Sequence, residues 1–324
     1  MKKVITLVFV AVLLCSAQAE PAAYPKSIVV FDGFWLGSVA GGKWKHVEDF
    51  LEDMAAPERQ DWSSSQWDNE YPFPYPWGGQ QYAVYLSSGF FGAARGEELH
   101  INRDSEFGDE LDKIKLHTGD ERKDATLLNV AYLGLSGIND MEGGNSPYPR
   151  KAAALSVKNA TYEKIMKEYL ARNGLPDATV NIMQLFRVDL EGDGVDEVVI
   201  YAQNVVDPKK YADLWKQDKP MEEFMPVIKP VTERGMYSVL LLRKIVSGKV
   251  SEIPLVSFVA SKGASPDEGS IPIVQCVYQF ADLNGDGTLE IIFGGAHYEG
   301  YDYNVVEVRK NGSVEIMLSN GSGR

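Results

Sequence analysis

The sequence is poor in cysteine and in long apolar runs. Cys15 and Cys276 are its only cysteines, and Cys15 lies in an N-terminal segment that we expect to be removed, so a disulfide within the mature chain is excluded. The one long apolar run, Val4 to Leu14, is shorter than the ~20 residues of a membrane-spanning helix. We therefore expect no transmembrane segment and a fold held together by its core or by bound metal.

The N-terminal stretch "MKKVITLVFVAVLLCSAQAE" is typical of a secretory signal. Two lysines precede the apolar run, and a small-residue pattern follows that ends at Ala19, so residues 1–19 are predicted to be cleaved off after Ala19. Leu14 stands before Cys15, where a lipid-modified cysteine normally follows a small residue, so we do not expect lipoprotein anchoring at Cys15. The mature chain is predicted to be secreted or periplasmic.

Positive charge is also scarce. The 324 residues include 32 Lys and Arg against 46 Asp and Glu, for a net charge of −14, and acidic residues outnumber basic ones on both sides of Pro176. Nucleic acid and anionic membranes both require a basic face, so neither is an expected partner. The four histidines do not have the spacing of a zinc site, and no GxSxG motif is present. The sequence therefore identifies no catalytic nucleophile or base.

A helix divides the chain. "NATYEKIMKEYLARNGLP" has apolar residues at helical spacing, Asn159 or Thr161 as a cap, and Gly174 and Pro176 as a stop. Residues 20–176 are predicted to form a mixed α+β region with hairpins in "SIVVFDGFWLGSVAGGKWKHV" and "YAVYLSSGFFGAARGEEL". Further expected elements are a short helix at Lys45 to Met54 and strands at Leu127 to Leu135 and at Ala152 to Val157.

Residues 177–324 repeat one pattern in two units, at about 180–259 and 271–319. Each unit reads as strand, acidic loop, strand and then a hairpin, which turns at Ser247-Gly248 in the first unit and at Asn311-Gly312 in the second. A short helix is expected around Lys209 to Lys216. The predicted fold class is mainly β with some α (α+β), with two tandem four-stranded blade-like antiparallel units that pack as propeller-like blades or as a sandwich.

The two acidic loops, "DLEGDGVDE" and "DLNGDGTLE", place oxygen donors at alternate positions around a glycine. The candidate ligands are Asp189, Glu191, Asp193, the Val195 carbonyl and Glu197 in the first loop, and Asp282, Asn284, Asp286, the Thr288 carbonyl and Glu290 in the second. Calcium takes six to eight such oxygens, and alternate residues of a tight loop converge on one point. The loops are not helix-loop-helix calcium hands, because Ile200 and Phe293 stand where those need a glutamate.

These two loops resemble the calcium loops of FG-GAP/VCBS-type repeats, found in secreted bacterial proteins and in the propeller of integrin alpha chains. The resemblance covers the C-terminal half and implies one Ca2+ in each loop, bound by the ten residues given above. It departs from the family pattern in the long side chain of Glu191 and in the glutamates at the last ligand position. The alternative is that both loops are calcium-free turns held by Asx hydrogen bonds.

An aromatic stretch marks the first half of the chain. Its rings are Trp62, Trp67, Tyr71, Phe73, Tyr75, Trp77, Tyr82 and Tyr85, and they either cover the core or form a platform for sugar or peptide. The preferred function is an exported, non-enzymatic calcium-binding scaffold, of ligand-binding or adhesion type, for an extracellular or envelope glycan or protein. The alternative is a secreted hydrolase of extracellular glycans or peptides that uses carboxylates beside the aromatic stretch.

Overall fold

The computed structural model describes residues 28–40, 42–46, 79–97, 101–102, 110–111, 115–136, 147–229, 233–261 and 272–323. The predicted signal, Cys15 and the aromatic residues from Trp62 to Trp77 lie outside these residues. Four antiparallel sheets account for most of what is described, so the predicted mainly β class is confirmed. No helix among the described residues is long and apolar enough to cross a membrane.

The N-terminal region forms a seven-stranded sheet with the order β3-β2-β1-β9-β4-β5-β8. Its strands are β1 (Ile28–Phe31), β2 (Phe34–Ala40), β3 (Lys43–His46), β4 (Gln81–Leu86), β5 (Gly89–Gly96), β8 (Leu116–His117) and β9 (Leu133–Ser136). Strands β6 (Ile101–Asn102) and β7 (Glu110–Leu111) form a separate pair. Both predicted hairpins are present, because β1 pairs with β2 and β4 pairs with β5.

The C-terminal half forms two antiparallel sheets with strands in chain order, one over each of the two units expected from the sequence. The first contains β11 (Ile182–Val188), β12 (Glu197–Gln203), β13 (Tyr237–Val246) and β14 (Lys249–Val259), and the short strand β10 (Ala153–Ala154) extends it at the β11 edge. The second contains β15 (Val274–Ala281), β16 (Glu290–His297), β17 (Gly300–Val308) and β18 (Val314–Gly323). β10 precedes the expected division at Pro176 but belongs to the five-stranded sheet.

The helices are α2 (Glu121–Leu127), α3 (Ala160–Arg172), α4 (Pro208–Lys216) and the 3-10 helix η1 (Met221–Val227). α3 begins after its predicted cap, Asn159, and α4 matches the predicted helix. Two predictions were wrong in part. Leu127 ends α2, so the strand expected from Leu127 starts only at Leu133. Lys45 and His46 belong to β3 because they pair with β2, and the rest of the helix expected there, 47–54, lies outside the described residues.

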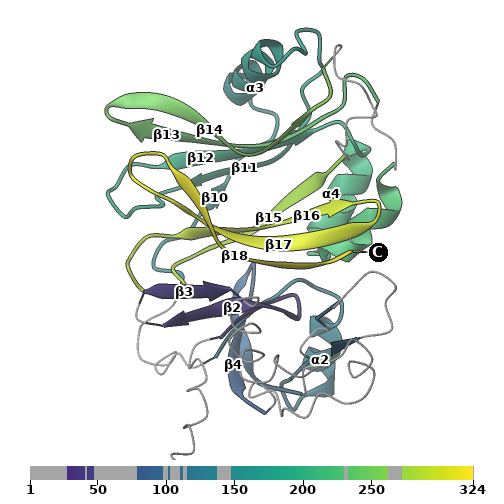
Figure 1. The fold of residues 1–324 in the computed structure, drawn as a ribbon, viewed down its shortest axis with the longest axis vertical. Helices are drawn as coiled ribbons and strands as arrows, with labels where there is room; N and C mark the ends of the chain where they lie inside the picture. Colours follow the sequence, from purple (N-terminus) through teal and green to yellow (C-terminus); the bar gives the residue numbers. More distant parts are fainter. Residues whose placement is uncertain are drawn as a thin grey trace, which may run out of the picture.

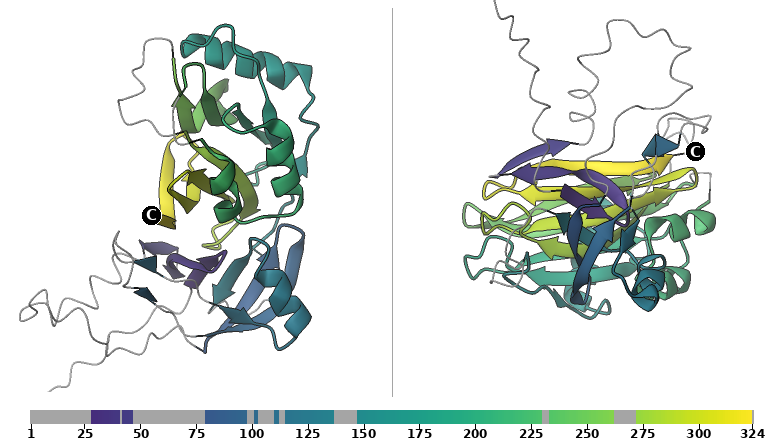
Figure 2. Two further views of the ribbon diagram at one scale, coloured as in Figure 1. Left: turned by 90° about the vertical axis from the view of Figure 1, so that its right-hand side faces the viewer. Right: turned by 90° about the horizontal axis from the view of Figure 1, so that it is seen from below.

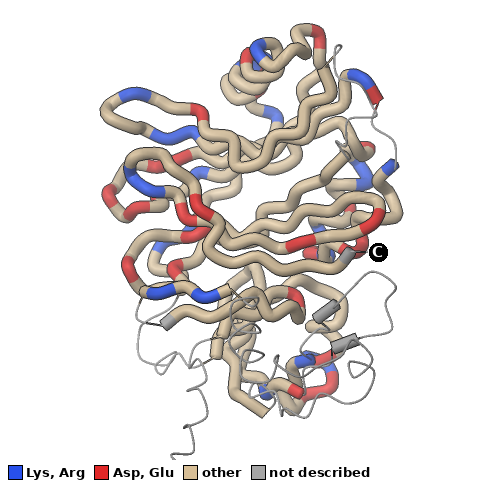
Figure 3. The backbone as a smooth tube through the Cα atoms, viewed as in Figure 1, with Lys and Arg blue, Asp and Glu red and all other residues tan. Residues whose placement is uncertain are grey.

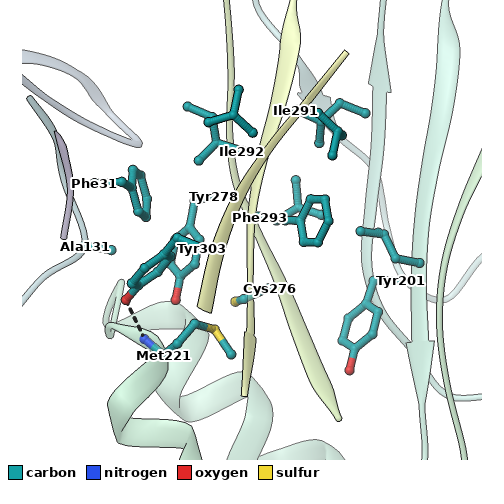
Figure 4. Close-up of a cluster of buried hydrophobic side chains, with 14 of the residues drawn as sticks. Phe31, Ala131, Tyr201, Met221, Cys276, Tyr278, Ile291, Ile292, Phe293 and Tyr303 are labelled. Carbon is teal, nitrogen blue, oxygen red and sulfur yellow. Dashed lines mark hydrogen bonds between the residues drawn. The ribbon is translucent and has the colours of Figure 1, made fainter. Parts of the chain in front are cut away.

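The sheets stack in three layers, with the four-stranded sheet between the other two (Figures 1 and 2). One hydrophobic core contains residues of all three layers, such as Phe31, Tyr201 and Ile292. Figure 4 shows this core: Ile292 faces Phe31, while Phe293, its neighbour in β16, points toward Tyr201. β16 is therefore apolar on both faces at this point, which explains its unbroken run "IIF" after Glu290.

Each of the two outer sheets buries one face in the shared core, and a separate hydrophobic cluster covers its other face. In β12, Val199 and Tyr201 enter the shared core, whereas Ile200 contacts the cluster under α3 that contains Met166 and Leu170. This alternation follows from the two-residue period of a strand. β11 and β15, which lead into the two acidic loops, therefore belong to neighbouring layers that share one core.

Candidate metal centre

The two acidic loops occupy equivalent places in the two units. The first connects β11 to β12 after the pair Val188 and Glu197, and the second connects β15 to β16 after the pair Ala281 and Glu290. The loops lie beside each other at one edge of the stacked sheets, where acidic residues gather (Figure 3). A hydrogen bond of 2.8 Å from the Leu289 amide to the Leu190 carbonyl joins them.

Arg150 fastens the two loops together. Its Nε donates to the Asp189 carbonyl at 2.7 Å, and its Nη2 donates to the Leu190 carbonyl at 3.0 Å and to the Gly287 carbonyl at 2.6 Å. Nearby, the Asp282 amide donates to the Pro147 carbonyl at 2.7 Å. Arg150 could not be predicted as a contact of the loops, because an isolated arginine in an irregular segment carries no pattern that points to them.

Within each loop, the short Asp and Asn side chains accept hydrogen bonds from the backbone. Asp189 accepts from the Gly192 amide at 2.7 Å and from the Gly194 amide at 3.0 Å, and Asp282 accepts from the Gly285 and Gly287 amides at 2.7 and 2.9 Å. Asp193, Asn284 and Asp286 each accept from the amide two residues further on. Such Asx hydrogen bonds hold a tight turn in either the presence or the absence of metal.

A glutamate closes each loop from inside the sheet. Glu197 Oε2 accepts from the Leu190 amide at 2.9 Å, and Glu290 Oε2 accepts from the Leu283 amide at 2.8 Å. Both glutamates are buried, at 3% and 0% exposure. The apolar neighbours Leu190 and Leu283 are buried as well, so the chain is anchored on both sides of each loop.

The ammonium group of a lysine from a neighbouring strand lies against the first loop. Lys244 reaches in from β13, and its Nζ lies 2.6 Å from Glu191 Oε2 and 3.4 Å from Glu197 Oε1. The Lys244 side chain is 1% exposed. Burial raises the pKa of the Glu197 carboxyl, while the Leu190 amide and the Lys244 charge oppose the rise. Glu191 Oε1 has no hydrogen-bond partner among the described residues.

The second loop contains a buried carboxylate without a cation among the described residues. Glu290 Oε1 has no hydrogen-bond partner there, although its other oxygen is bonded. The pKa of the Glu290 carboxyl is raised to about 8, chiefly by burial. The neighbouring carboxylates Asp282, Asp286 and Glu307 add to the rise because each disfavours a further negative charge.

The second loop therefore fits a calcium ion better than the first. It combines carboxylates, the Asn284 amide oxygen and a buried oxygen that lacks a partner, which are the ligand types that calcium prefers. In the first loop, the Lys244 ammonium already lies against two of the proposed ligands, Glu191 and Glu197. Among the described residues, no three His, Cys, Asp or Glu side chains form a ready-made metal cluster, so the ligand sets remain predictions.

A pocket of about 340 Å³ opens where the three layers meet, next to the loops. Its aromatic lining comes from Tyr148, Phe186, Trp215, Tyr278 and Phe280, and its other lining residues are Ser87, Ser88, Gly89, Arg150, Lys151, Ala152, Ala154 and Gln279. None of these residues is an acid or a histidine. The pocket wall shares Arg150 with the loops, so loop structure and pocket structure are physically connected.

The region proposed for the alternative hydrolase is described only in part. Tyr82 and Tyr85 are buried in β4, which fits rings that cover the core, and the rest of the aromatic stretch lies outside the described residues. Glu97 and Asp124 flank His117 at 2.7 and 3.2 Å, on an exposed part of the surface. Of the other carboxylates there, Glu98 and Asp109 lie outside the described residues.

Fold and loops together define a class: a β protein of three stacked antiparallel sheets with a pair of acidic loops at one edge. Comparison of the chain with protein-family models, with curated proteins and with solved structures gives no match. The functional argument therefore rests on the loops and the pocket.

Proposed function

We propose that the protein is an exported, non-enzymatic calcium-binding scaffold that presents a ligand site. The observation that carries the proposal is Glu290 Oε1, a fully buried carboxylate oxygen that has no partner among the described residues and lies near Asp282 and Asp286. With its pKa raised to about 8, this carboxyl stays largely protonated at pH 7 without metal, and a bound cation would stabilise its charged form as a ligand. In this proposal the ion stabilises the loop, because its ligands all come from one short segment.

Calcium titration by calorimetry and thermal melting of the full chain test the proposal. At a calcium concentration 100 times the Kd, binding stabilises the folded state by about 2.7 kcal/mol. We expect heat of binding and a higher Tm in calcium than in EGTA. If calcium produces neither heat nor a shift in Tm, the loops are metal-free Asx turns and the calcium proposal is wrong.

The variant Asp286→Ala locates the ion. It removes a proposed ligand of the second loop, so we expect it to eliminate the calcium-induced rise in Tm. Asp177→Ala is the matched control, because Asp177 is an exposed acid outside both loops. Equal responses of both variants to calcium would place the ion elsewhere.

For the ligand, the pocket beside Arg150 is the proposed binding site. Aromatic rings at a surface recess stack on sugar rings and on apolar side chains, and five aromatic residues line this pocket. Its position beside the loops links the two parts of the proposal, since Arg150 contributes both to the pocket wall and to the loop contacts. Glycans or peptides of an envelope or extracellular partner are the expected ligands.

A glycan and peptide array, followed by tryptophan fluorescence, tests this second part. A ligand that enters the pocket should change the emission of Trp215, and Trp215→Phe should remove that change while Trp44→Phe, in the N-terminal sheet, retains it. Binding that is insensitive to Trp215→Ala would place the ligand site outside the pocket.

A further inference from the structure

We propose that the Lys244 ammonium is the permanent cation of the first loop, so that the chain binds a single calcium ion, in the second loop. The second half of this inference rests on the proposed function, because it uses the same calcium site. The first half concerns only the residues around Lys244. The sequence predicts a calcium ion in each loop. In this proposal the second loop binds calcium, and the Lys244 side chain takes the place of the ion in the first loop.

The sheet registers identify the equivalent residues. Val198 pairs with Arg243 between β12 and β13, which places Glu197 opposite Lys244. Ile291 pairs with Val306 between β16 and β17, which places Glu290 opposite Glu307. The same position beside the closing glutamate therefore holds a cation in one unit and a carboxylate in the other.

In the first unit, the long Glu191 side chain forms an ion pair with Lys244. Glu191 is 8% exposed, and its Oε2 lies 2.6 Å from the Lys244 Nζ, within hydrogen-bonding distance. Glu197 Oε1 lies 3.4 Å from the same nitrogen. A divalent ion near these two carboxylates would meet a like charge that is already buried, and like charges at short range repel strongly in a low-dielectric site.

In the second unit, no lysine or arginine among the described residues forms an ion pair with Glu290. Asn284 replaces Glu191, and Glu307 replaces Lys244, so these positions keep the same number of acids and lose the cation. Glu307 is 18% exposed, and its Oε1 lies 3.5 Å from Nε of the half-exposed Arg309. Asp282, Asp286 and Glu307 lie near the partnerless Glu290 Oε1, so an added cation would meet acidic side chains and a free ligand oxygen.

The first test counts calcium ions on the full chain by calorimetry and native mass spectrometry. We expect one ion on the unmodified chain, one on Asp193→Ala and none on Asp286→Ala. Two ions on the unmodified chain, of which one is lost in Asp193→Ala, would overturn the inference and leave the proposed function intact. A single ion that is lost in Asp193→Ala would overturn both, because it would place that ion in the first loop. This test needs no substitution at Lys244.

The second test removes the lysine in the Asp286→Ala background, where the second loop is disabled. Lys244→Gln keeps a polar side chain but removes the charge, so we expect a lower Tm in EGTA and a recovery of several degrees in calcium. Asp286→Ala with Lys244 intact should not respond to calcium. Adding Asp193→Ala to the double variant should abolish the recovery, because Asp193 is a ligand of the opened loop.

The outcomes separate the inference from the proposed function. If the unmodified chain binds no calcium, the proposed function fails, and the response of Lys244→Gln alone then decides the role of the lysine. A calcium-dependent recovery in that variant supports a built-in cation. A lower Tm that calcium does not raise means that Lys244 only packs and pairs there, and the inference is wrong. If Lys244→Gln does not fold, the ion count of the unmodified chain decides.

Discussion

Single residues decide how the buried charge of each loop is offset. Glu197 and Glu290 both accept an amide hydrogen bond inside the sheet, yet only Glu197 has a lysine beside it. Removing a carboxylate from water is expensive unless an opposite charge or several donors replace the lost hydration. Equivalent backbones thus carry different electrostatics because of one residue on the adjacent strand, Lys244 or Glu307.

Cys276 offers a prediction at the residue scale. Its thiol is buried in the shared core, and burial raises its pKa to about 12 (Figure 4). Because only the thiolate reacts, we expect no reaction with a disulfide reagent at pH 8 in the native chain and complete reaction after unfolding. The measurement uses Cys15→Ser so that Cys276 is the only thiol. Rapid labelling of the native variant would contradict the buried position.

Gly294 is a second prediction at this scale. A Cβ at this position would lie 2.4 Å from Met221 Cγ and 3.1 Å from the Asp302 carbonyl oxygen. Gly294→Ala should therefore lower the free energy of unfolding by about 1–3 kcal/mol, the usual cost of overpacking. Denaturant unfolding measures it, and Met221→Ala is the partner in a double-mutant cycle. The double variant should lose less stability than the sum of the single variants, whereas strict additivity would argue against the clash.

At the scale of elements, β15 shows how an open sheet edge is satisfied. β15 is an edge strand, and Gln184 of β11 pairs with it: Gln184 Oε1 accepts from the Val277 amide at 2.8 Å, and its Nε2 donates to the Val277 carbonyl at 3.0 Å. Two tyrosine hydroxyls, of Tyr201 and Tyr211, bond the backbone of Gln275. Side chains from the five-stranded sheet and α4 thus take the place of a further strand.

Gln184→Met tests this edge. The substitution keeps the size of the side chain but leaves the buried amide and carbonyl of Val277 without partners, so we expect a loss of about 2–4 kcal/mol in the free energy of unfolding. Gln217→Met is the control, because the Gln217 amide bonds an exposed carbonyl at the end of α4. A loss of similar size in the control would show that the edge pairing has no special role.

At the scale of the whole molecule, short connections between layers matter as much as the sheets. Arg150 precedes β10 in the chain and bonds carbonyls in the loops of two different sheets. Arg150→Met should therefore lower the free energy of unfolding by about 1–3 kcal/mol, since it removes charge-assisted hydrogen bonds from part-buried carbonyls.

Lys151→Met is the matched control for Arg150→Met. Lys151 is the neighbouring residue and is exposed, so its loss should change the free energy of unfolding by less than about 0.5 kcal/mol. In calcium, Arg150→Met should also weaken any ligand bound at the pocket, because the same residue lines the pocket wall. Lys151 lines that pocket too, so Lys151→Met is a control for stability alone. Equal stability of the two variants in urea unfolding would mean that the loops are held together without Arg150.

The sequence by itself determined the local elements of this protein. Two-residue alternation and turn residues predicted the strands of both repeat units, and a polar cap with a glycine and proline stop predicted α3, because these signals depend on the backbone and its nearest neighbours. The acidic loops were also predicted, although their ions remain a proposal. The segment Leu127–Leu135 was predicted less well, since its apolar residues suit a helix end and a strand equally.

Only the tertiary structure decided which residues meet. The stacking of three sheets, the bridge from Arg150, the pairing of Gln184 with β15 and the approach of Lys244 to Glu191 all join positions far apart in the chain. Such contacts depend on register and layer packing, which no local pattern encodes. The two acidic loops look alike in sequence, and their different charge environments come from the residue that the neighbouring strand places beside each one.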